Sequence, residues 1–156
     1  MNIKIRYFKR TSLEKKAFEK VIRKYAKLKY DILIVFDLRI KCFGTHAWND
    51  KKRCHIIRIS PTKCKIHIDE DNLSGVRLGP AAEKYRIIST LLHELRHAQQ
   101  KEELGSRYYN EKYDSIEEIT NPQVASWYSE CERDARIFED KNIESAVELY
   151  DLSCEE

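Results

Sequence analysis

The pentapeptide His93-Glu94-Leu95-Arg96-His97 governs how the rest of this chain is interpreted. It matches the pattern H-E-x-x-H and lies inside a helical pattern that we predict from about residue 81 to residue 104. Residues four apart lie about one turn apart on the same helix face, so the two imidazoles can bind one ion. Glu94 lies beside the first histidine, where its carboxylate could reach a water molecule on that ion. The pattern therefore predicts a metal centre on this helix.

Zinc is the metal that this pattern favours. At such a site zinc keeps one coordination position open, polarises a substrate carbonyl and lowers the pKa of its bound water to about 7. Glu94 would then accept the proton of that water as the general base. This chemistry indicates hydrolysis of an amide, most simply of a peptide bond.

The predicted helix presents its two histidines away from its apolar side. At about 100° per residue, His93 and His97 lie nearly opposite a stripe of mostly apolar residues. That stripe consists of Lys84, Ile87, Ile88, Leu91, Leu95 and Ala98. We expect the stripe to anchor the helix in the core while the imidazoles face a different layer.

A third protein ligand has to come from another segment. No histidine follows His97. The longer metzincin pattern, H-E-x-x-H-x-x-G-x-x-H, is excluded because Gln100 stands at its glycine position and Glu103 at its third histidine position. The third ligand is therefore expected to be a carboxylate or, less readily, a thiol.

The next predicted helix, at residues 122–140, offers two carboxylates at the edge of its buried face. Cys131 points into the core. Glu132 and Asp134 each lie about 80° from the centre of the buried face, on opposite sides of it. Glu130 lies further toward solvent. Glu132 has the longer reach and is favoured, but Asp134 stays an alternative.

These motifs resemble a known group of enzymes. H-E-L-R-H on one helix, with Glu132, Asp134 and Ala135 (E-x-D-A) on a later helix, resembles the small zincin-like metallopeptidases of the Glu-ligand kind, including those of phages and prophages. The resemblance implies that His93, His97 and Glu132 bind Zn²⁺ and that Glu94 is the general base. It also implies an edge strand beside the active helix that holds an extended substrate, for which residues 44–48 and 54–60 are candidates.

The fold expected from the whole pattern is α+β, in a single domain of residues 1–156. We predict a small antiparallel sheet, an N-terminal helix that begins with a Thr11/Glu14 capping box, the active-site helix and a C-terminal helix with the glutamate ligand. In chain order, the predicted elements are a strand at 3–8, a helix at 13–28, strands at 32–40, 54–60 and 63–69, and helices at 81–104, 122–140 and 143–150. This order is that of a minimal zincin-like core.

Charge is distributed unevenly along the chain. Residues 1–66 carry 19 Lys and Arg against 5 Asp and Glu (+14), and the remainder carries 10 against 21 (−11), which sums to the net +3. Either the two halves face each other, which is favoured, or the basic half binds an anionic partner such as nucleic acid. The lysine-rich face of the first predicted helix would carry that second role.

The sequence favours a cytoplasmic protein without a membrane partner. The longest apolar run, residues 32–36, is far shorter than the roughly 20 residues that cross a bilayer. The N-terminus lacks the apolar stretch of a signal peptide, and the five cysteines include no C-x-x-C pair. The oligomeric state is not predicted.

The leading functional hypothesis is a zinc-dependent metallopeptidase that acts on an intracellular protein or peptide. The alternative is a nucleic-acid-associated or host-factor-binding protein whose zinc site is structural or vestigial. Tyr108, Tyr109 and Tyr113 include possible donors to an oxyanion, but a loop packed over the cleft is favoured and none is assigned. The three other histidines, His46, His55 and His67, are expected to lie outside the metal shell.

Overall fold

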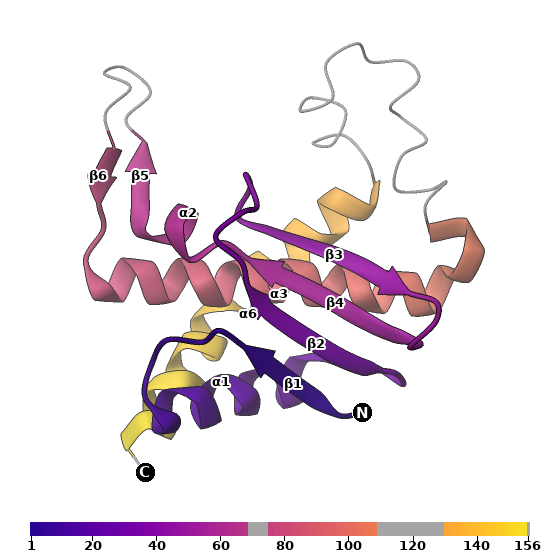
Figure 1. The fold of residues 1–156 in the computed structure, drawn as a ribbon, viewed down its shortest axis with the longest axis horizontal. Coiled ribbons are helices and arrows are strands. Elements are labelled where there is room, and N and C mark those ends of the chain that lie inside the picture. The colour runs from indigo at the N-terminus through magenta and orange to yellow at the C-terminus, as the bar shows by residue number, and fades with distance from the viewer. Residues whose placement is uncertain (69–74, 109–129, 156) are drawn as a thin grey trace.

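A four-stranded mixed sheet forms one side of the molecule, and helices cover one of its faces (Figure 1). The computed structural model describes residues 1–68, 75–108 and 130–155. The strands of this sheet, in spatial order, are β1 (Ile3–Arg6), β2 (Asp31–Phe36), β4 (Cys54–Ile59) and β3 (Gly44–Asn49). The coarse α+β class is therefore confirmed.

The predicted antiparallel arrangement of the sheet is wrong. β1 pairs with β2 in parallel, β2 pairs with β4 in parallel, and only β3 is antiparallel to its neighbour β4. β2 and β4 are parallel because the chain passes through the antiparallel strand β3 between them. β1 and β2 are parallel because α1 (Ser12–Tyr25) carries the chain back from the end of β1 to the start of β2. A crossover of this kind joins parallel strands, whereas a tight turn would have joined antiparallel ones.

The strand predicted at 63–69 is confirmed only at residues 66–68 and is wrong at its start. The short helix α2 (Pro61–Lys65) begins there, with Ser60 Oγ accepting a hydrogen bond from Lys63 N at 3.1 Å. Proline at the first helical position after a capping serine favours a helix start over a simple turn. The segment then forms β5 (Ile66–Ile68), which pairs with β6 (Gly75–Arg77) in a separate two-stranded sheet.

Two long helices and α1 provide the remaining framework. The Thr11/Glu14 capping box at the start of α1 is confirmed, and α3 (Pro80–Leu104) spans the predicted active-site helix. A 3-10 turn, η1 (Gly105–Arg107), follows α3. None of the described helices has the length and apolar character needed to cross a membrane.

The two C-terminal helices predicted at 122–140 and 143–150 are replaced by one continuous helix, α6 (Glu130–Glu155). The junction contains neither glycine nor proline, and Asn142 Nδ2 donates to Phe138 O at 2.7 Å within the helix. The chain therefore has no local reason to break there. Residues 122–129 of the first predicted helix lie outside the described residues.

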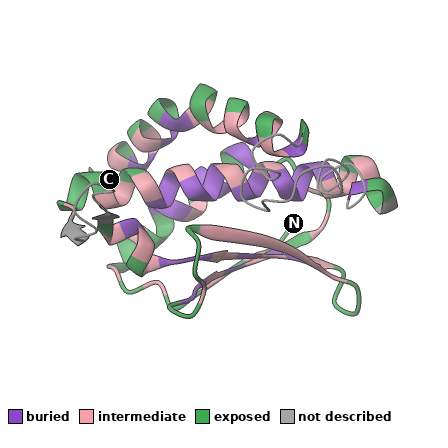
Figure 2. Cartoon of the chain, turned by 90° about the horizontal axis from the view of Figure 1, so that it is seen from above, coloured by how far each residue is buried: buried purple, intermediate pink, exposed green. Residues whose placement is uncertain are grey.

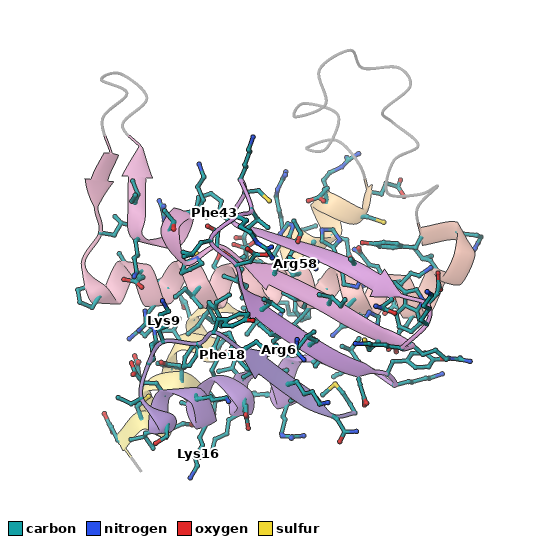
Figure 3. All side chains as sticks on the ribbon, viewed as in Figure 1. Arg6, Lys9, Lys16, Phe18, Phe43 and Arg58 are labelled. Atoms are coloured by element: carbon teal, nitrogen blue, oxygen red, sulfur yellow. The ribbon has the colours of Figure 1, made fainter. Side chains whose placement is uncertain are left out.

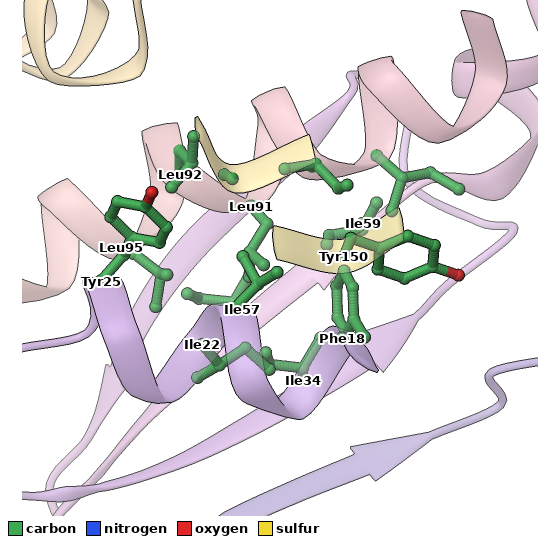
Figure 4. Close-up of a cluster of buried hydrophobic side chains, with 14 of the residues drawn as sticks. Phe18, Ile22, Tyr25, Ile34, Ile57, Ile59, Leu91, Leu92, Leu95 and Tyr150 are labelled. Carbon is green, nitrogen blue, oxygen red and sulfur yellow. The ribbon is translucent and has the colours of Figure 1, made fainter. Parts of the chain in front are cut away.

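The core lies between the sheet and the helices. Burial is concentrated along the middle of α3 and on the sheet face that the helices cover (Figure 2). Phe18 and Ile22 of α1 meet Ile34 and Ile57 of the sheet, and Leu91 of α3 joins the same cluster (Figure 4). Tyr150 brings α6 into this core. The packing fixes α3 between the sheet and α6.

Gly44, the first residue of β3, allows this strand to lie directly on α3. A Cβ at this position would lie 2.5 Å from Thr90 Cγ2, 3.1 Å from Glu94 Cγ and 3.2 Å from the Arg58 carbonyl oxygen. Only a residue without a side chain fits such an approach. The glycine therefore sets the distance between the edge strand and the helix that carries the H-E-x-x-H motif.

We predict that Gly44→Ala lowers the free energy of unfolding by about 2 kcal/mol, because the new methyl group overpacks the contact with α3. Thr90→Ser removes the closest methyl group and should restore at least half of that stability in the double variant. Urea unfolding of the three variants measures both effects.

Gly79→Ala is the matched control, because a Cβ there meets no atom within 4 Å. Gly79 is the N-cap of α3, so its replacement should cost less than about 1 kcal/mol. A Gly44→Ala variant as stable as the wild type would contradict the close approach.

Candidate metal centre

Three side chains from two helices converge on one point. His93 and His97 of α3 place their Nε2 atoms 3.2 Å apart. Glu132, in the first turn of α6, places its carboxylate oxygens 3.0 Å from His93 Nε2 and 3.1 Å from His97 Nε2. Within the described residues, this is the one group of three or more His, Cys, Asp or Glu side chains with metal-binding geometry.

The spacing of these three donors suits a small tetrahedral ion. Bonds of about 2.0–2.1 Å to nitrogen and oxygen place the ligand atoms of a tetrahedral zinc site about 3.3 Å apart. The three separations of 3.0–3.2 Å require little movement to reach that value. Two imidazoles and one carboxylate also form a ligand set that leaves a fourth position open, as catalytic zinc sites do.

The outer nitrogen of His93 is held by a second carboxylate. His93 Nδ1 lies 3.1 Å from Glu139 Oε2, and the other oxygen of Glu139 accepts a hydrogen bond from Ser89 Oγ. Metal-bound histidines commonly donate their second N–H to a carboxylate, which fixes the ring orientation and the tautomer. With its Nδ1 proton donated to Glu139, a neutral His93 ring has the lone pair on Nε2, where it can bind an ion.

The outer nitrogen of His97 is held by an amide in the same way. His97 Nδ1 donates to Gln100 Oε1 at 2.8 Å. The amide nitrogen of Gln100 in turn donates to Cys131 O at 2.9 Å and to Asp134 Oδ2 at 2.7 Å, which defines the orientation of the amide. Both rings thus direct Nε2 toward Glu132.

The charges of this cluster compensate each other in the metal-free protein. Burial opposes a charge on His93, but hydrogen bonds to Glu132 and Glu139 outweigh it and raise the pKa of His93 to about 9. Burial likewise opposes the Glu132 carboxylate, but the hydrogen bonds from both histidines outweigh it and hold the pKa of Glu132 well below its usual value. In the metal-free protein, the positive charge of the His93 imidazolium therefore balances the Glu132 carboxylate. A bound dication would take the place of the His93 proton.

Asp134, the alternative third ligand, faces a different group. Its Oδ2 atom accepts hydrogen bonds from Arg96 Nε at 2.6 Å and from Gln100 Nε2 at 2.7 Å. It is therefore outside the cluster formed by the two histidines and Glu132. Glu130 is exposed, as the sequence predicts.

Glu94 lies below the edge strand. Only 6% of its surface is exposed, and its Cγ lies beside the backbone of Gly44. The negative charge of Glu94 is close enough to contribute to the raised pKa of His93 and, after the larger effect of burial, to the raised pKa of the Cys42 thiol. The structure thus places Glu94 beside Gly44 of β3 and buries it, whereas the sequence predicts only that it lies beside the first histidine.

The histidines on the sheet form a separate network. His55 is fully buried, with Nε2 2.9 Å from Glu102 Oε1 and Nδ1 3.0 Å from His46 Nε2. Burial lowers the pKa of His55 against the opposing effect of Glu102, so the neutral ring donates to Glu102 and accepts from His46. Glu102 also accepts from the backbone N–H groups of Lys29 and Tyr30. This network ties the end of α3 to β4 and to the start of β2.

The other histidine and tyrosine candidates lie at different places. Tyr108 is buried, and its ring lies 6.5 Å from the ring of His97 and 5.9 Å from that of His46. His67 lies on β5. Tyr109 and Tyr113 lie outside the described residues.

Sequence inspection missed Glu139 and Gln100 as partners of the histidines. Glu139 lies seven residues after Glu132, which is two helical turns and the same face of α6. Gln100 lies three residues after His97, which is one turn of α3. These spacings could have suggested both residues, but only the packing of α6 against α3 distinguishes them from the many other acids and amides of the two helices.

Comparisons with known proteins add no relative. No protein-family model, no curated protein and no solved structure matches the chain. The fold and site define the chain as an α+β protein with a His-His-Glu cluster between two helices.

We predict that the protein binds one zinc ion and that Glu132→Gln lowers the affinity at least 100-fold, because a charged ligand is removed. Glu139→Gln should lower the affinity about 10- to 100-fold by releasing the ring of His93. Competition with a chromophoric chelator measures these constants.

Two neighbouring variants are the controls. Glu130→Gln changes an exposed residue in the same helical turn, and Asp134→Asn changes the alternative ligand. Glu130→Gln should bind zinc within about threefold of the wild type, and Asp134→Asn, whose amide oxygen can still accept from Gln100, should bind zinc at least tenfold more tightly than Glu132→Gln. Loss of zinc in Asp134→Asn together with retention in Glu132→Gln would reverse the assignment of the third ligand.

Proposed function

We propose that this protein is a zinc-dependent metallopeptidase in which His93, His97 and Glu132 hold the metal and Glu94 is the general base. The observation that carries the proposal is the convergence of two Nε2 atoms and one carboxylate while both Nδ1 atoms are held by Glu139 and Gln100. Metal-bound histidines commonly have the outer nitrogen held by a carboxylate or another acceptor, as both rings do here. Resemblance to Glu-ligand zincin-like enzymes in motif order supports the same function.

Zinc, when bound, would supply Lewis acidity toward a scissile carbonyl and toward the attacking water. Glu94 is the group of this chain that would take the proton from that water and deliver it to the leaving amine. The adjacent position in sequence keeps Glu94 near the metal ligands without making it one of them.

The edge strand β3 is the proposed site for an extended substrate. Among the described strands, β3 pairs with β4 on one side and ends the order of the sheet, so its other edge is the one at which a further strand would pair. It also packs on α3 at Gly44, next to Glu94. A peptide added along β3 would therefore run past the H-E-x-x-H face of α3.

We predict that Glu94→Gln retains one zinc ion and lowers peptide hydrolysis about 100-fold or more, because the amide cannot accept a proton. The zinc-loaded wild type and the variant are incubated with cell lysate, and new protein N-termini are identified by mass spectrometry. New N-termini should form with the wild type alone.

Glu144→Gln, the same chemical change at an exposed position of α6, is the control and should cleave like the wild type. Identical N-terminal profiles for the zinc-loaded wild type and Glu94→Gln would contradict the proposed enzyme. They would favour the host-factor-binding alternative, in which the metal is structural.

A second candidate function, binding of nucleic acid, is supported by the surface of α1. Its cations Lys15, Lys16, Lys20, Arg23 and Lys24 are all exposed, and Lys16 points away from the body of the molecule (Figure 3). A row of cations along one helix matches the phosphates of a nucleic acid backbone. We place this function second because it leaves the metal cluster without a role.

If nucleic acid binds to α1, replacing Lys15, Lys16 and Lys24 by Gln should reduce the slope of log K against log salt by about 0.9 for each phosphate that is no longer neutralised. Fluorescence anisotropy with double-stranded DNA measures the slope. Salt is varied between about 20 and 200 mM, where the affinity of such complexes falls steeply. Lys51→Gln with Lys52→Gln, in the turn between β3 and β4, is the control. Absence of binding at the lowest salt would remove this candidate.

A further inference from the structure

A cavity lies away from the metal centre, at the carboxyl ends of β1 and β2. Its volume is about 530 Å³, within the usual range of small-molecule sites. It is lined by the segments that follow the two strands, by the start of α2 and by the first turns of α3. Ile87 on its wall precedes His93 by six residues, about 9 Å along the axis of α3. None of the proposed metal ligands lines it.

The topology favours a ligand at this place. β1 and β2 are parallel, with Arg6 beside Val35, so their carboxyl ends open at the same edge of the sheet. Open α/β sheets bind ligands outside the carboxyl ends of parallel strands, most often at a switch point of the strand order, which β1 and β2 do not form. The loop after β1 also holds Tyr7 at φ +62°, a strained conformation for a residue other than glycine.

The interior of the cavity is largely apolar. Phe8, Phe36 and Ile87 form part of its wall, and the rings of Phe8 and Phe36 lie 5.1 Å apart. Two further apolar side chains of the lining, Tyr7 and Leu38, are 70% and 67% exposed. Large exposed apolar groups beside an apolar hollow are typical of a binding surface.

The charged groups of the lining have an excess of cations. Lys9, Arg10, Arg39 and Lys65 face two acids, Asp37 and Glu83. Both acids are already paired. Glu83 accepts from Arg10 at 2.8 Å, and Asp37 accepts two hydrogen bonds from the guanidinium of Arg39, at 2.9 and 3.0 Å.

Lys9 and Lys65 are the cations left for a ligand. Neither has an ion pair with any carboxylate of the residues described by the structure. Lys9 is exposed, in the loop after β1 (Figure 3), and Lys65 is half-buried at the end of α2. The cavity thus combines an apolar wall with two ammonium groups that no described carboxylate neutralises.

From this combination we propose that the cavity binds a small amphipathic anion, with an apolar body against Phe8 and Phe36 and an acidic head group between Lys9 and Lys65. The body buries apolar surface, which supplies most of the affinity. The head group gains from two ammonium groups that have no competing carboxylate among the described residues. This site is independent of the metal centre and of the proposed peptidase activity.

The fluorescent anion 8-anilinonaphthalene-1-sulfonate is the probe, because it has an aromatic body and one sulfonate. Titrated into the full chain, it should bind one equivalent, and octanoate or octyl phosphate should displace it while octylammonium should not. Lys9→Gln with Lys65→Gln should weaken binding about tenfold, because the double variant removes both ammonium groups that attract the acidic head group. Leu38→Ser should weaken it severalfold by removing apolar contact.

Lys15→Gln with Lys16→Gln makes the same charge change on α1 and should leave binding within twofold. Leu152→Ser, at an exposed position of α6, is the matched control for the apolar change. The proposal is overturned if the probe binds without a defined stoichiometry, if the control pair weakens binding as much as the cavity pair, or if octylammonium displaces the probe as well as octanoate does. Displacement by octyl phosphate but not octanoate would retain the site and restrict the head group to phosphate.

Discussion

The double-sided packing of α3 is the constraint on which the site depends. One side of this helix buries Leu91 and Leu95 completely against the core, and the other side presents His93 and His97 to α6. Close packing allows a buried helix little rotation or sliding. The positions of both imidazoles are therefore fixed by apolar contacts that have no chemical role, and Gly44 then brings the edge strand to the same helix.

The interface between α3 and α6 holds several charged side chains. Glu132 and Glu139 of α6 contact His93, and Arg96 of α3 contacts Asp134. Buried charges are stable only when they are paired and hydrogen-bonded. Each of these groups has such a partner, so the polar contacts position α6 on α3 while the apolar contacts of Tyr150 and Ala146 hold it in place. A bound dication would join the same network, which links metal binding to the attachment of α6.

The uneven charge of the chain has more than one structural outcome. Arg10 of the basic half pairs with Glu83 of the acidic half, so one part of the excess is used within the molecule. The cations of α1 point outward, and Lys9 and Lys65 border the cavity at the end of the sheet. The acidic half, in contrast, gathers carboxylates around two histidines, where a dication would be stabilised. The small net charge of +3 is therefore the sum of internal ion pairs, exposed cations and a cluster of carboxylates around two histidines.

The sequence by itself determined the helix that carries the H-E-x-x-H motif, the capping box of α1, the α+β class and the exposure of Glu130 beside a half-buried Glu132, because these follow from local patterns of apolar and polar residues. The tertiary structure alone decided the parallel sheet, the burial of Glu94 and the contacts of Glu139 and Gln100 with the two histidines. It also separated Asp134 from the cluster by pairing it with Arg96. The physical reason is that strand direction and contacts between helices depend on packing between residues far apart in the chain, which no local pattern encodes.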